Sequence, residues 1–263
     1  MLEAAGLSFR TAPRFHNRVA WAERLRLNGG VERRGSIYVP HGDWRALEAA
    51  ELCLLVGDHG SATASEPPAA PDVHADLIAI PPHVRTAWWA VAEHDPVDGH
   101  NAGYDRFVAD VIEFLRFKQL ALPDGCRLDV VASRPDQSST RLSAAGTLAG
   151  LAFSASATAE TTSGSRVVAV INLGDEGTYL VLLPLAPEAM AASLSENAAG
   201  GPGTAPRHEL LDRFFRVFPA HPLVRVRLEP GDGLWLPSWG VVYDGWTHGK
   251  EDVDIILTIR TGA

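Results

Sequence analysis

Cysteine is scarce in this chain, and its two copies show no paired spacing. Cys53 and Cys126 lie far apart and form no Cys-x-x-Cys motif, so the sequence contains neither a zinc-ribbon pattern nor a thiol redox pair. Cys53 lies between Leu52 and Leu54, where a small thiol packs well among apolar side chains. We therefore expect two free cysteines, with Cys53 in the core, and no disulfide bond.

Long apolar segments are also missing. No run reaches the roughly 18–20 residues that a membrane-spanning helix needs. Residues 1–18 do not place a basic segment before an apolar one, which is the pattern of a secretory signal. Hydrophobic residues nevertheless make up 46% of the chain, enough to form a sizeable core. We expect a cytoplasmic protein that neither spans nor binds a membrane.

Basic residues are too few for a protein that binds nucleic acid. The 23 lysines and arginines are outnumbered by 32 aspartates and glutamates, which gives a net charge of −9. Phosphate backbones require a positive face, and the one basic cluster, within residues 24–34, is diluted by Glu23 and Glu32. We expect a small molecule as the partner. The sequence does not specify an oligomeric state.

The first 124 residues show mainly helix and loop signals. Asp43 is placed to cap a helix over residues 43–48. Residues 61–71 combine small residues with prolines, which predicts a loop. Apolar residues recur at helical spacing across residues 104–120, which predicts an amphipathic helix. We expect residues 1–124 to form mainly helical and loop support within a single domain that spans residues 1–263.

After residue 125 the pattern changes to short strands separated by turns. The strands are expected at residues 128–132, 146–155, 167–173, 179–185, 224–228, 234–237, 241–245 and 253–259. Residues 191–206 predict a mobile insertion, which either covers the mouth of a barrel or forms an inert surface loop, and residues 209–218 predict a short helix. This spacing, with a Pro-Gly-Asp turn at residues 230–232, is typical of a double-stranded β-helix. The sequence therefore predicts an α+β fold, in which flanking N-terminal helices support a double-stranded β-helix (cupin or jelly-roll) barrel over residues 125–263.

Four stretches of the barrel half carry a family pattern, namely Gly150 to Ser154, Val170 to Glu176, Pro230 to Asp232 and Tyr243 to Gly249. In order and spacing they resemble small bacterial iron/2-oxoglutarate-dependent oxygenases. That group is related to clavaminate-synthase-like enzymes and is often found in natural-product pathways. The resemblance covers roughly residues 125–260 and implies an oxygenase-like barrel.

The same resemblance identifies positions for a metal. In that family a His-x-Asp motif on the first stretch and a histidine at the start of the last bind Fe(II). Carried over by position, these ligands fall on Ala152, Ser154 and Tyr243. Alanine cannot coordinate a metal, and neutral serine and a lone tyrosine are poor Fe(II) ligands, so we expect no metal and no cofactor. The alternative, Fe(II) with 2-oxoglutarate held by displaced ligands, stays open, although the barrel half contains only three histidines.

Three residues around the corresponding cavity are candidates for catalysis. Tyr243 could donate a hydrogen bond or act as a general acid, and Asp244 could act as a base if it is buried. Ser154 is the third candidate. Asp244 also matches the Asp-Gly turn of the family, so a role in that turn is an equal alternative.

Four further residues are candidates for substrate binding: Arg134, Gln137, Trp246 and Arg260. Related oxygenases use an arginine of the last strand to bind the distal carboxylate of 2-oxoglutarate, and the planar guanidinium of Arg260 suits that role. Strand alternation places Arg260 on the same face as Ile256 and Thr258. The alternative is an exposed arginine near the end of the chain.

These observations favour an enzyme that acts on a small molecule in natural-product biosynthesis. An oxygenase-like pocket without its iron ligands predicts a redox-neutral, metal-independent step, such as cyclisation, isomerisation or elimination. Two alternatives remain: an active Fe(II)/2-oxoglutarate oxygenase with displaced ligands, and a catalytically dead subunit that binds a ligand or a partner. The sequence does not identify the substrate.

Overall fold

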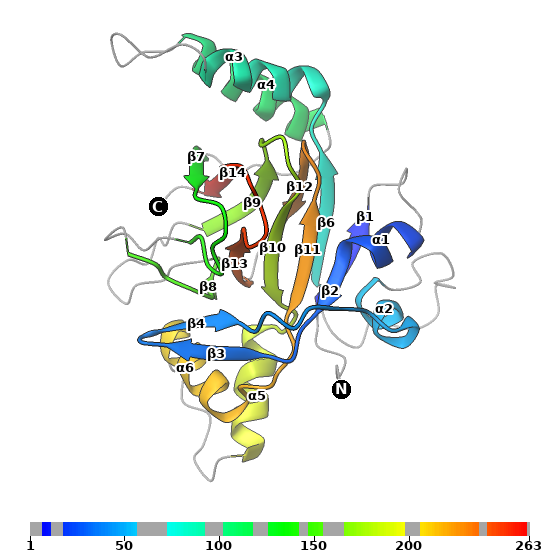
Figure 1. Ribbon diagram of the computed structural model, residues 1–263, viewed down its shortest axis with the longest axis vertical. Coiled ribbons are helices and arrows are strands. Elements are labelled where there is room, and N and C mark those ends of the chain that lie inside the picture. The colour runs from blue at the N-terminus through cyan, green and yellow to red at the C-terminus, as the bar shows by residue number, and fades with distance from the viewer. Residues whose placement is uncertain are drawn as a thin grey trace.

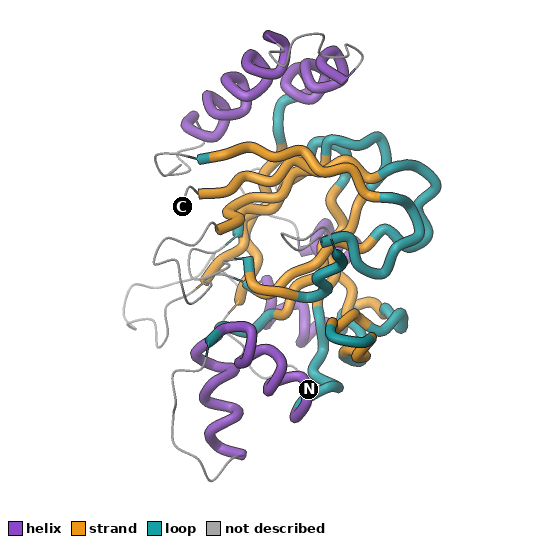
Figure 2. Tube along the Cα trace, turned by 90° about the vertical axis from the view of Figure 1, so that its left-hand side faces the viewer, coloured by secondary structure: helices purple, strands orange, loops and turns teal. Residues whose placement is uncertain are grey.

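The computed structural model describes residues 7–11, 18–56, 73–92, 102–117, 126–141, 147–154, 166–197, 206–236 and 241–261. Two six-stranded sheets face each other around a common interior (Figure 2), and a two-stranded hairpin lies beside them. The helices are α1 (Arg18–Arg24), α2 (Ala49–Val56), α3 (Pro82–Ala92), α4 (Ala102–Phe117), α5 (Pro187–Asn197) and α6 (Arg207–Val217). Because helices and mostly antiparallel strands occur together, the expectation of an α+β fold is confirmed.

The first sheet contains both strands from the start of the chain and strands from its end. Its strands are, in spatial order, β1 (Leu7–Thr11), β6 (Val73–Ala79), β12 (Asp232–Trp235), β9 (Arg166–Asn172), β14 (Asp254–Thr261) and β7 (Arg127–Ser133). β1 and β6 run parallel, and the other neighbours run antiparallel. The last strand, β14, therefore lies inside the sheet and not at its edge.

The second sheet is antiparallel throughout. Its strands are, in spatial order, β5 (Arg45–Ala46), β2 (Leu25–Leu27), β11 (Val224–Leu228), β10 (Thr178–Leu183), β13 (Val242–Trp246) and β8 (Ala152–Phe153). The separate hairpin consists of β3 (Val31–Arg34) and β4 (Ile37–Pro40). Between residues 126 and 261, every strand that the structure describes overlaps a stretch in which the sequence predicts a strand.

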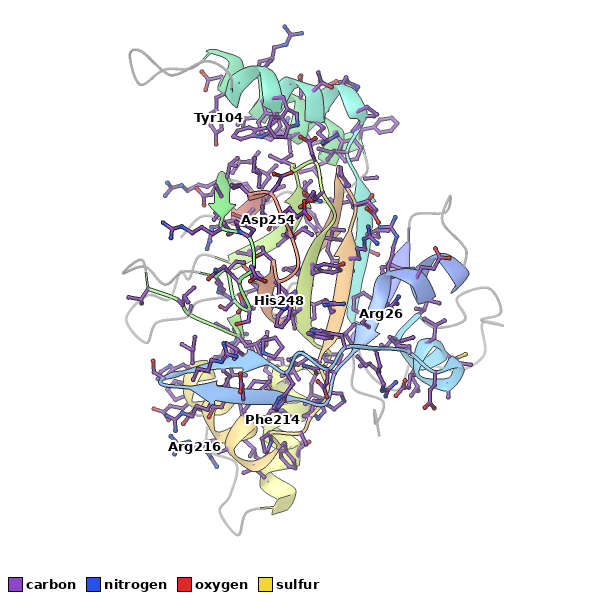
Figure 3. The ribbon with its side chains drawn as sticks, viewed as in Figure 1. Arg26, Tyr104, Phe214, Arg216, His248 and Asp254 are labelled. Carbon is purple, nitrogen blue, oxygen red and sulfur yellow. The ribbon has the colours of Figure 1, made fainter. Side chains whose placement is uncertain are left out.

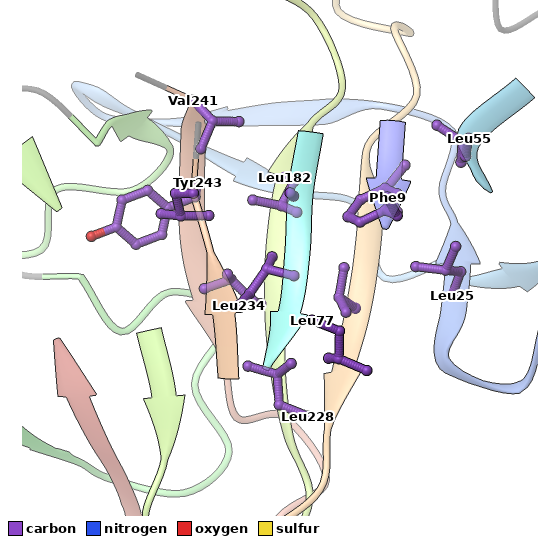
Figure 4. Close-up of a cluster of buried hydrophobic side chains, with 14 of the residues drawn as sticks. Phe9, Leu25, Leu55, Leu77, Leu182, Leu228, Leu234, Val241 and Tyr243 are labelled. Atoms are coloured by element: carbon purple, nitrogen blue, oxygen red, sulfur yellow. The ribbon is translucent and has the colours of Figure 1, made fainter. Parts of the chain in front are cut away.

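Strand alternation divides the apolar residues into an inner core and two outer layers. Leu180 and Leu182 of β10 face the inner core between the sheets (Figure 4), whereas Val181 and Leu183 of the same strand face α5, α6 and the β3–β4 hairpin. Phe214 of α6 is buried in this second layer (Figure 3). The third layer joins α3 and α4 to the outer face of the first sheet (Figure 1). Both sheets are thus covered on the outside by helices.

The Pro-Gly-Asp turn before β12 is held by a backbone carbonyl and a side chain from other parts of the chain. Gly231 has φ +87°, a conformation that favours glycine, and its N–H donates to the carbonyl oxygen of Asn172 over 2.8 Å. The carboxylate of Asp232 accepts the N–H of Glu229 at 3.1 Å and pairs with Arg24. The acidic residue of this turn therefore has a structural role.

The first half of the chain contains more strand than the sequence predicts. Four of its strands, β1, β2, β5 and β6, extend the two sheets, and the same half contains α1 to α4. The helix expected over residues 43–48 is wrong: that segment contains β5, and α2 begins at Ala49. The side chain of Asp43 instead accepts the N–H of Gly29 at 3.2 Å. The helix expected over residues 104–120 is confirmed as α4.

Two smaller expectations also change. The insertion expected at residues 191–206 begins inside α5, whose Met190 and Leu194 are buried against α6. Residues 198–205 and the loop expected at 61–71 lie outside the described residues. Both cysteines are free, as expected, but Cys53 is exposed, because α2 turns Leu55 and Val56 to the core instead.

No helix in the described parts of the chain combines the length and the apolar composition needed to cross a membrane.

Candidate functional site

A cavity of about 170 Å³ lies between the two sheets, bounded by β7, β9 and β14 on one side and by β10 and β13 on the other. Its principal polar side chains are those of Arg141, Thr178, Tyr243, Asp254, Thr258 and Arg260. An engineered apolar cavity of about 150 Å³ binds benzene. The interior can therefore hold a small organic molecule of similar or slightly larger size.

Tyr243 lies at the junction of this cavity and the inner core. It is the cross-strand partner of Ala152, so two of the three positions identified by the family resemblance are neighbours. Figure 4 shows its ring beside the leucines of the inner core, with the hydroxyl directed away from them. The hydroxyl makes no hydrogen bond to any residue that the structure describes. It is therefore available to a bound molecule.

Arg141 covers the other side of the Tyr243 ring, with its guanidinium carbon 4.5 Å from the ring centroid. Its Nη1 donates to the carbonyl oxygen of Ala152 at 2.6 Å and, more weakly, to that of Tyr243 at 3.5 Å. Its Nη2 donates to the carbonyl oxygen of Phe153 at 2.6 Å. Backbone groups of β8 and β13 thus fix a cation in the cavity wall. Nothing in the sequence marks Arg141, because it follows a strand in a segment without periodicity or motif.

Asp244 follows Tyr243 on β13 and points away from the cavity, as strand alternation requires. Its Oδ1 accepts the N–H groups of Thr140, Arg141 and Gly245 at 3.2, 3.1 and 2.8 Å. Burial raises the pKa of the Asp244 carboxyl to about 6, and the backbone N–H groups only partly oppose this shift. In this structure Asp244 holds the loop that carries Arg141.

Ser154 and Trp246 do not line the cavity. The Oγ of Ser154 accepts the N–H of Val241 at 3.0 Å, so this hydroxyl helps to join β8 to the segment before β13. Trp246 lies on the outer face of the second sheet, where it packs edge-on against Trp44 at a centroid distance of 5.7 Å. Neither placement brings the side chain into contact with a molecule in the cavity.

Arg134 and Gln137 belong to the loop after β7, also outside the cavity lining. The Oγ1 of Thr247 donates to the carbonyl oxygen of Arg134 at 2.8 Å and accepts the N–H of Gln137 at 3.0 Å. The side chain of Arg134 is exposed. These contacts are made by the backbone, so the two residues shape the loop rather than the cavity.

Arg260 does line the cavity, and the expected alternation along β14 is confirmed. Arg260, Thr258 and Ile256 share the cavity face, whereas Leu257 and Ile259 face α3 and α4. The Nε of Arg260 lies 3.1 Å from a carboxylate oxygen of Asp129 on β7. Arg260 is thus paired within the first sheet and is not a frayed terminal residue.

A buried ion pair completes this end of β14. The Nζ of Lys250 lies 2.6 Å from Oδ1 of Asp254, and both side chains are almost fully enclosed. Asp254 borders the cavity at the start of β14 (Figure 3). The charge of Asp254 is therefore balanced inside the chain.

The positions that would hold iron do not fit that metal. Ala152 has no donor atom, Ser154 uses its hydroxyl within the backbone network, and Arg141 covers the ring of Tyr243. A guanidinium next to the site repels a second cation. Within the described residues, no three side chains of histidine, cysteine, aspartate or glutamate gather in a way that could hold a metal ion.

Comparisons with known proteins give no relative for this chain. Scans against protein-family models, curated proteins and solved structures return no match.

Proposed function

We propose that this chain is a cytoplasmic enzyme of natural-product biosynthesis that performs a redox-neutral, metal-independent step on a small molecule. The observation that carries this proposal is the hydroxyl of Tyr243, which borders a partly enclosed cavity and makes no hydrogen bond to a described residue. A phenol placed in this way can donate a hydrogen bond or a proton to an oxygen of the bound molecule. Such a donor assists a cyclisation, isomerisation or elimination in which negative charge develops on an oxygen of the substrate.

The proposal includes the fold: a double-stranded β-helix similar to that of iron/2-oxoglutarate oxygenases. Its support is the order of the last eight strands, in which β7, β9, β12 and β14 lie in one sheet and β8, β10, β11 and β13 lie in the other. In such a barrel the interior between the sheets is the usual place for a small molecule. The family similarity itself remains part of the proposal.

In this mechanism the cavity orients the substrate, and Tyr243 gives a proton to an oxygen of the substrate and takes a proton back as the product forms. Apolar side chains of both sheets, among them Val170 and Leu180, hold the body of the molecule, while Thr178 and Thr258 offer hydroxyl groups to its polar atoms. Holding a flexible molecule in a reactive conformation lowers the entropic part of the barrier. Arg260 remains a candidate for binding an acidic group, although Asp129 shares its guanidinium.

Tyr243→Phe tests the proposal because it removes one hydroxyl and keeps the ring. The protein is incubated with candidate pathway intermediates, and products are identified by mass spectrometry with and without a metal chelator. We expect turnover in both conditions, with a product that is an isomer of the substrate or has lost a small neutral molecule. Turnover by Tyr243→Phe should fall by roughly 10²–10⁴.

The two alternatives give other results in the same experiment. An Fe(II)/2-oxoglutarate oxygenase would consume oxygen and release succinate, and a chelator would stop it. A binding or partner subunit would retain its ligand unchanged. Full activity of a folded Tyr243→Phe protein would remove the proposed role of the hydroxyl.

A further inference from the structure

We infer that the molecule bound in this cavity carries a carboxylate and that Arg141 is the residue that binds it. This inference deepens the proposed function, since it names the chemical class of the ligand for the same cavity. It starts from a residue that the family resemblance does not identify.

Arg141 has unused hydrogen-bond donors. A guanidinium has five N–H groups, and the three contacts of Arg141 go from Nη1 to Ala152 and Tyr243 and from Nη2 to Phe153. This leaves the Nε–H and one Nη2–H without a partner among the described residues. The Nε–H and the neighbouring Nη2 of a guanidinium form an edge that can bind a carboxylate through two parallel hydrogen bonds.

The charge of Arg141 is also uncompensated within the described residues. The other cations of the cavity region have anionic partners: Arg260 pairs with Asp129, and Lys250 pairs with Asp254. The contacts of Arg141 go to neutral carbonyl oxygens and to the ring of Tyr243. A cation in a partly enclosed cavity favours an anion as its ligand.

The position of Arg141 is fixed before a ligand binds. The carboxylate of Asp244 accepts the backbone N–H groups of Thr140 and Arg141. Backbone carbonyl oxygens of β8 and β13 accept hydrogen bonds from the guanidinium. A binding group that is already ordered loses little conformational entropy on binding. The cavity of about 170 Å³ limits the rest of the molecule to a short body, and Val131 and Ile256 make part of its wall apolar. The ligand class is a small monocarboxylic acid with an apolar body.

Binding of matched acids and amides tests this inference on the intact chain. Acetate, isobutyrate and benzoate are compared with acetamide, isobutyramide and benzamide, and inorganic phosphate is included as a second anion. Affinities are measured by ligand-observed NMR at fixed ionic strength. We expect at least one carboxylate to bind about 10- to 100-fold more tightly than its amide, which is typical of a charge-assisted pair, and more tightly than phosphate.

Two arginine variants localise the effect. Arg141→Lys keeps the charge but not the two parallel donors, so the preference for the acid should fall about tenfold or more. Arg213→Met removes an exposed arginine of α6 and should leave the preference unchanged. Each variant is checked for folding by circular dichroism, and the comparison of acid with amide in the unmodified chain does not depend on any variant.

The outcomes separate this inference from the proposed function. Equal binding of every acid and its amide, tighter binding of phosphate, or an unchanged preference in folded Arg141→Lys would overturn the assignment of Arg141. Turnover of a neutral substrate that depends on Tyr243 would contradict this inference and leave the proposed function standing. Carboxylate binding through Arg141 without turnover of any candidate substrate would support this inference and contradict the proposed function.

Discussion

At the scale of single residues, two neighbours on β13, Tyr243 and Asp244, face opposite sides of the sheet and have different roles. Tyr243 faces the interior, and Asp244 faces outward and accepts three backbone N–H groups. The acidic residue that looks catalytic in the sequence therefore holds a loop. The residue that this loop presents to the cavity, Arg141, carries no sequence signal.

The buried carboxylate of Asp244 makes stability depend on pH. Burial raises its pKa from 3.8 to about 6, so the folded chain binds a proton more tightly than the unfolded chain does. From this group alone, the free energy of unfolding is highest below about pH 4 and falls as pH rises through about 6, by on the order of 3 kcal/mol in total. Above about pH 7 its effect is constant.

Asp244→Asn isolates this effect, because asparagine keeps an acceptor oxygen and does not titrate. Urea unfolding of both proteins from pH 4.5 to 7 should show the stability of the unmodified chain falling relative to the variant as pH rises. The other titratable groups are the same in both proteins, so their contributions cancel in the difference between the two free energies of unfolding. A difference that is constant across this range would contradict the raised pKa.

At the scale of elements, β11 shows how an outer sheet face can hold a charge. Arg225 lies between the rings of Trp44 and Tyr179, with its guanidinium carbon 4.8 and 4.3 Å from their centroids. Burial lowers the pKa of Arg225. The planar guanidinium thus replaces an apolar side chain in an aromatic stack.

Arg225→Lys should destabilise the protein by about 1–2 kcal/mol, because lysine is charged but cannot stack between two rings. The matched control is Arg227→Lys on the same strand, whose pair with Glu229 is exposed and should contribute about 0–1 kcal/mol. Both are measured by urea unfolding at pH 7. Equal losses in the two variants would argue against a specific role for the stack.

At the scale of the whole molecule, the two halves of the chain share both sheets. β6 pairs with β12, and β2 pairs with β11. Removing the first half would expose Leu234 and Val226, which are fully buried. The first half is thus part of the core rather than a support around it.

Residues 126–263 alone should therefore fail to fold, although they contain the strands that the sequence assigns to the barrel. Circular dichroism and size-exclusion chromatography should show an unfolded or aggregated chain, with the full-length protein as the control. A monomeric fragment with a cooperative unfolding transition would show that the barrel half is independent.

The sequence predicts the second half of this molecule better than the first for a physical reason. Between residues 126 and 261, alternating Val, Leu and Ile and the glycine-containing turns are local signals, and the strands appear where they indicate. In the first half, β5 and β2 are two and three residues long and owe their conformation to partners distant in sequence. A strand of two or three residues is too short to show the alternation of apolar and polar residues from which strands are predicted.

The candidate site is predictable only in part, for a related reason. The family resemblance points to Tyr243 and Arg260, with strand alternation as further support for Arg260, and both line the cavity. Ser154, Trp246, Arg134 and Gln137 were assigned from the family resemblance, which does not specify the direction of each side chain. Arg141 reaches the cavity through contacts with β8 and β13 that no single segment encodes.

The alternation of Tyr243 and Asp244 along β13 has a consequence for redesign. One strand carries the proposed proton donor and, through the loop, positions the guanidinium of Arg141, so a change in this strand would affect both groups together. Val131, Val170 and Ile256 line the cavity from the first sheet and hold neither group. A library confined to these three positions would vary the shape available to the substrate while leaving the reactive groups in place.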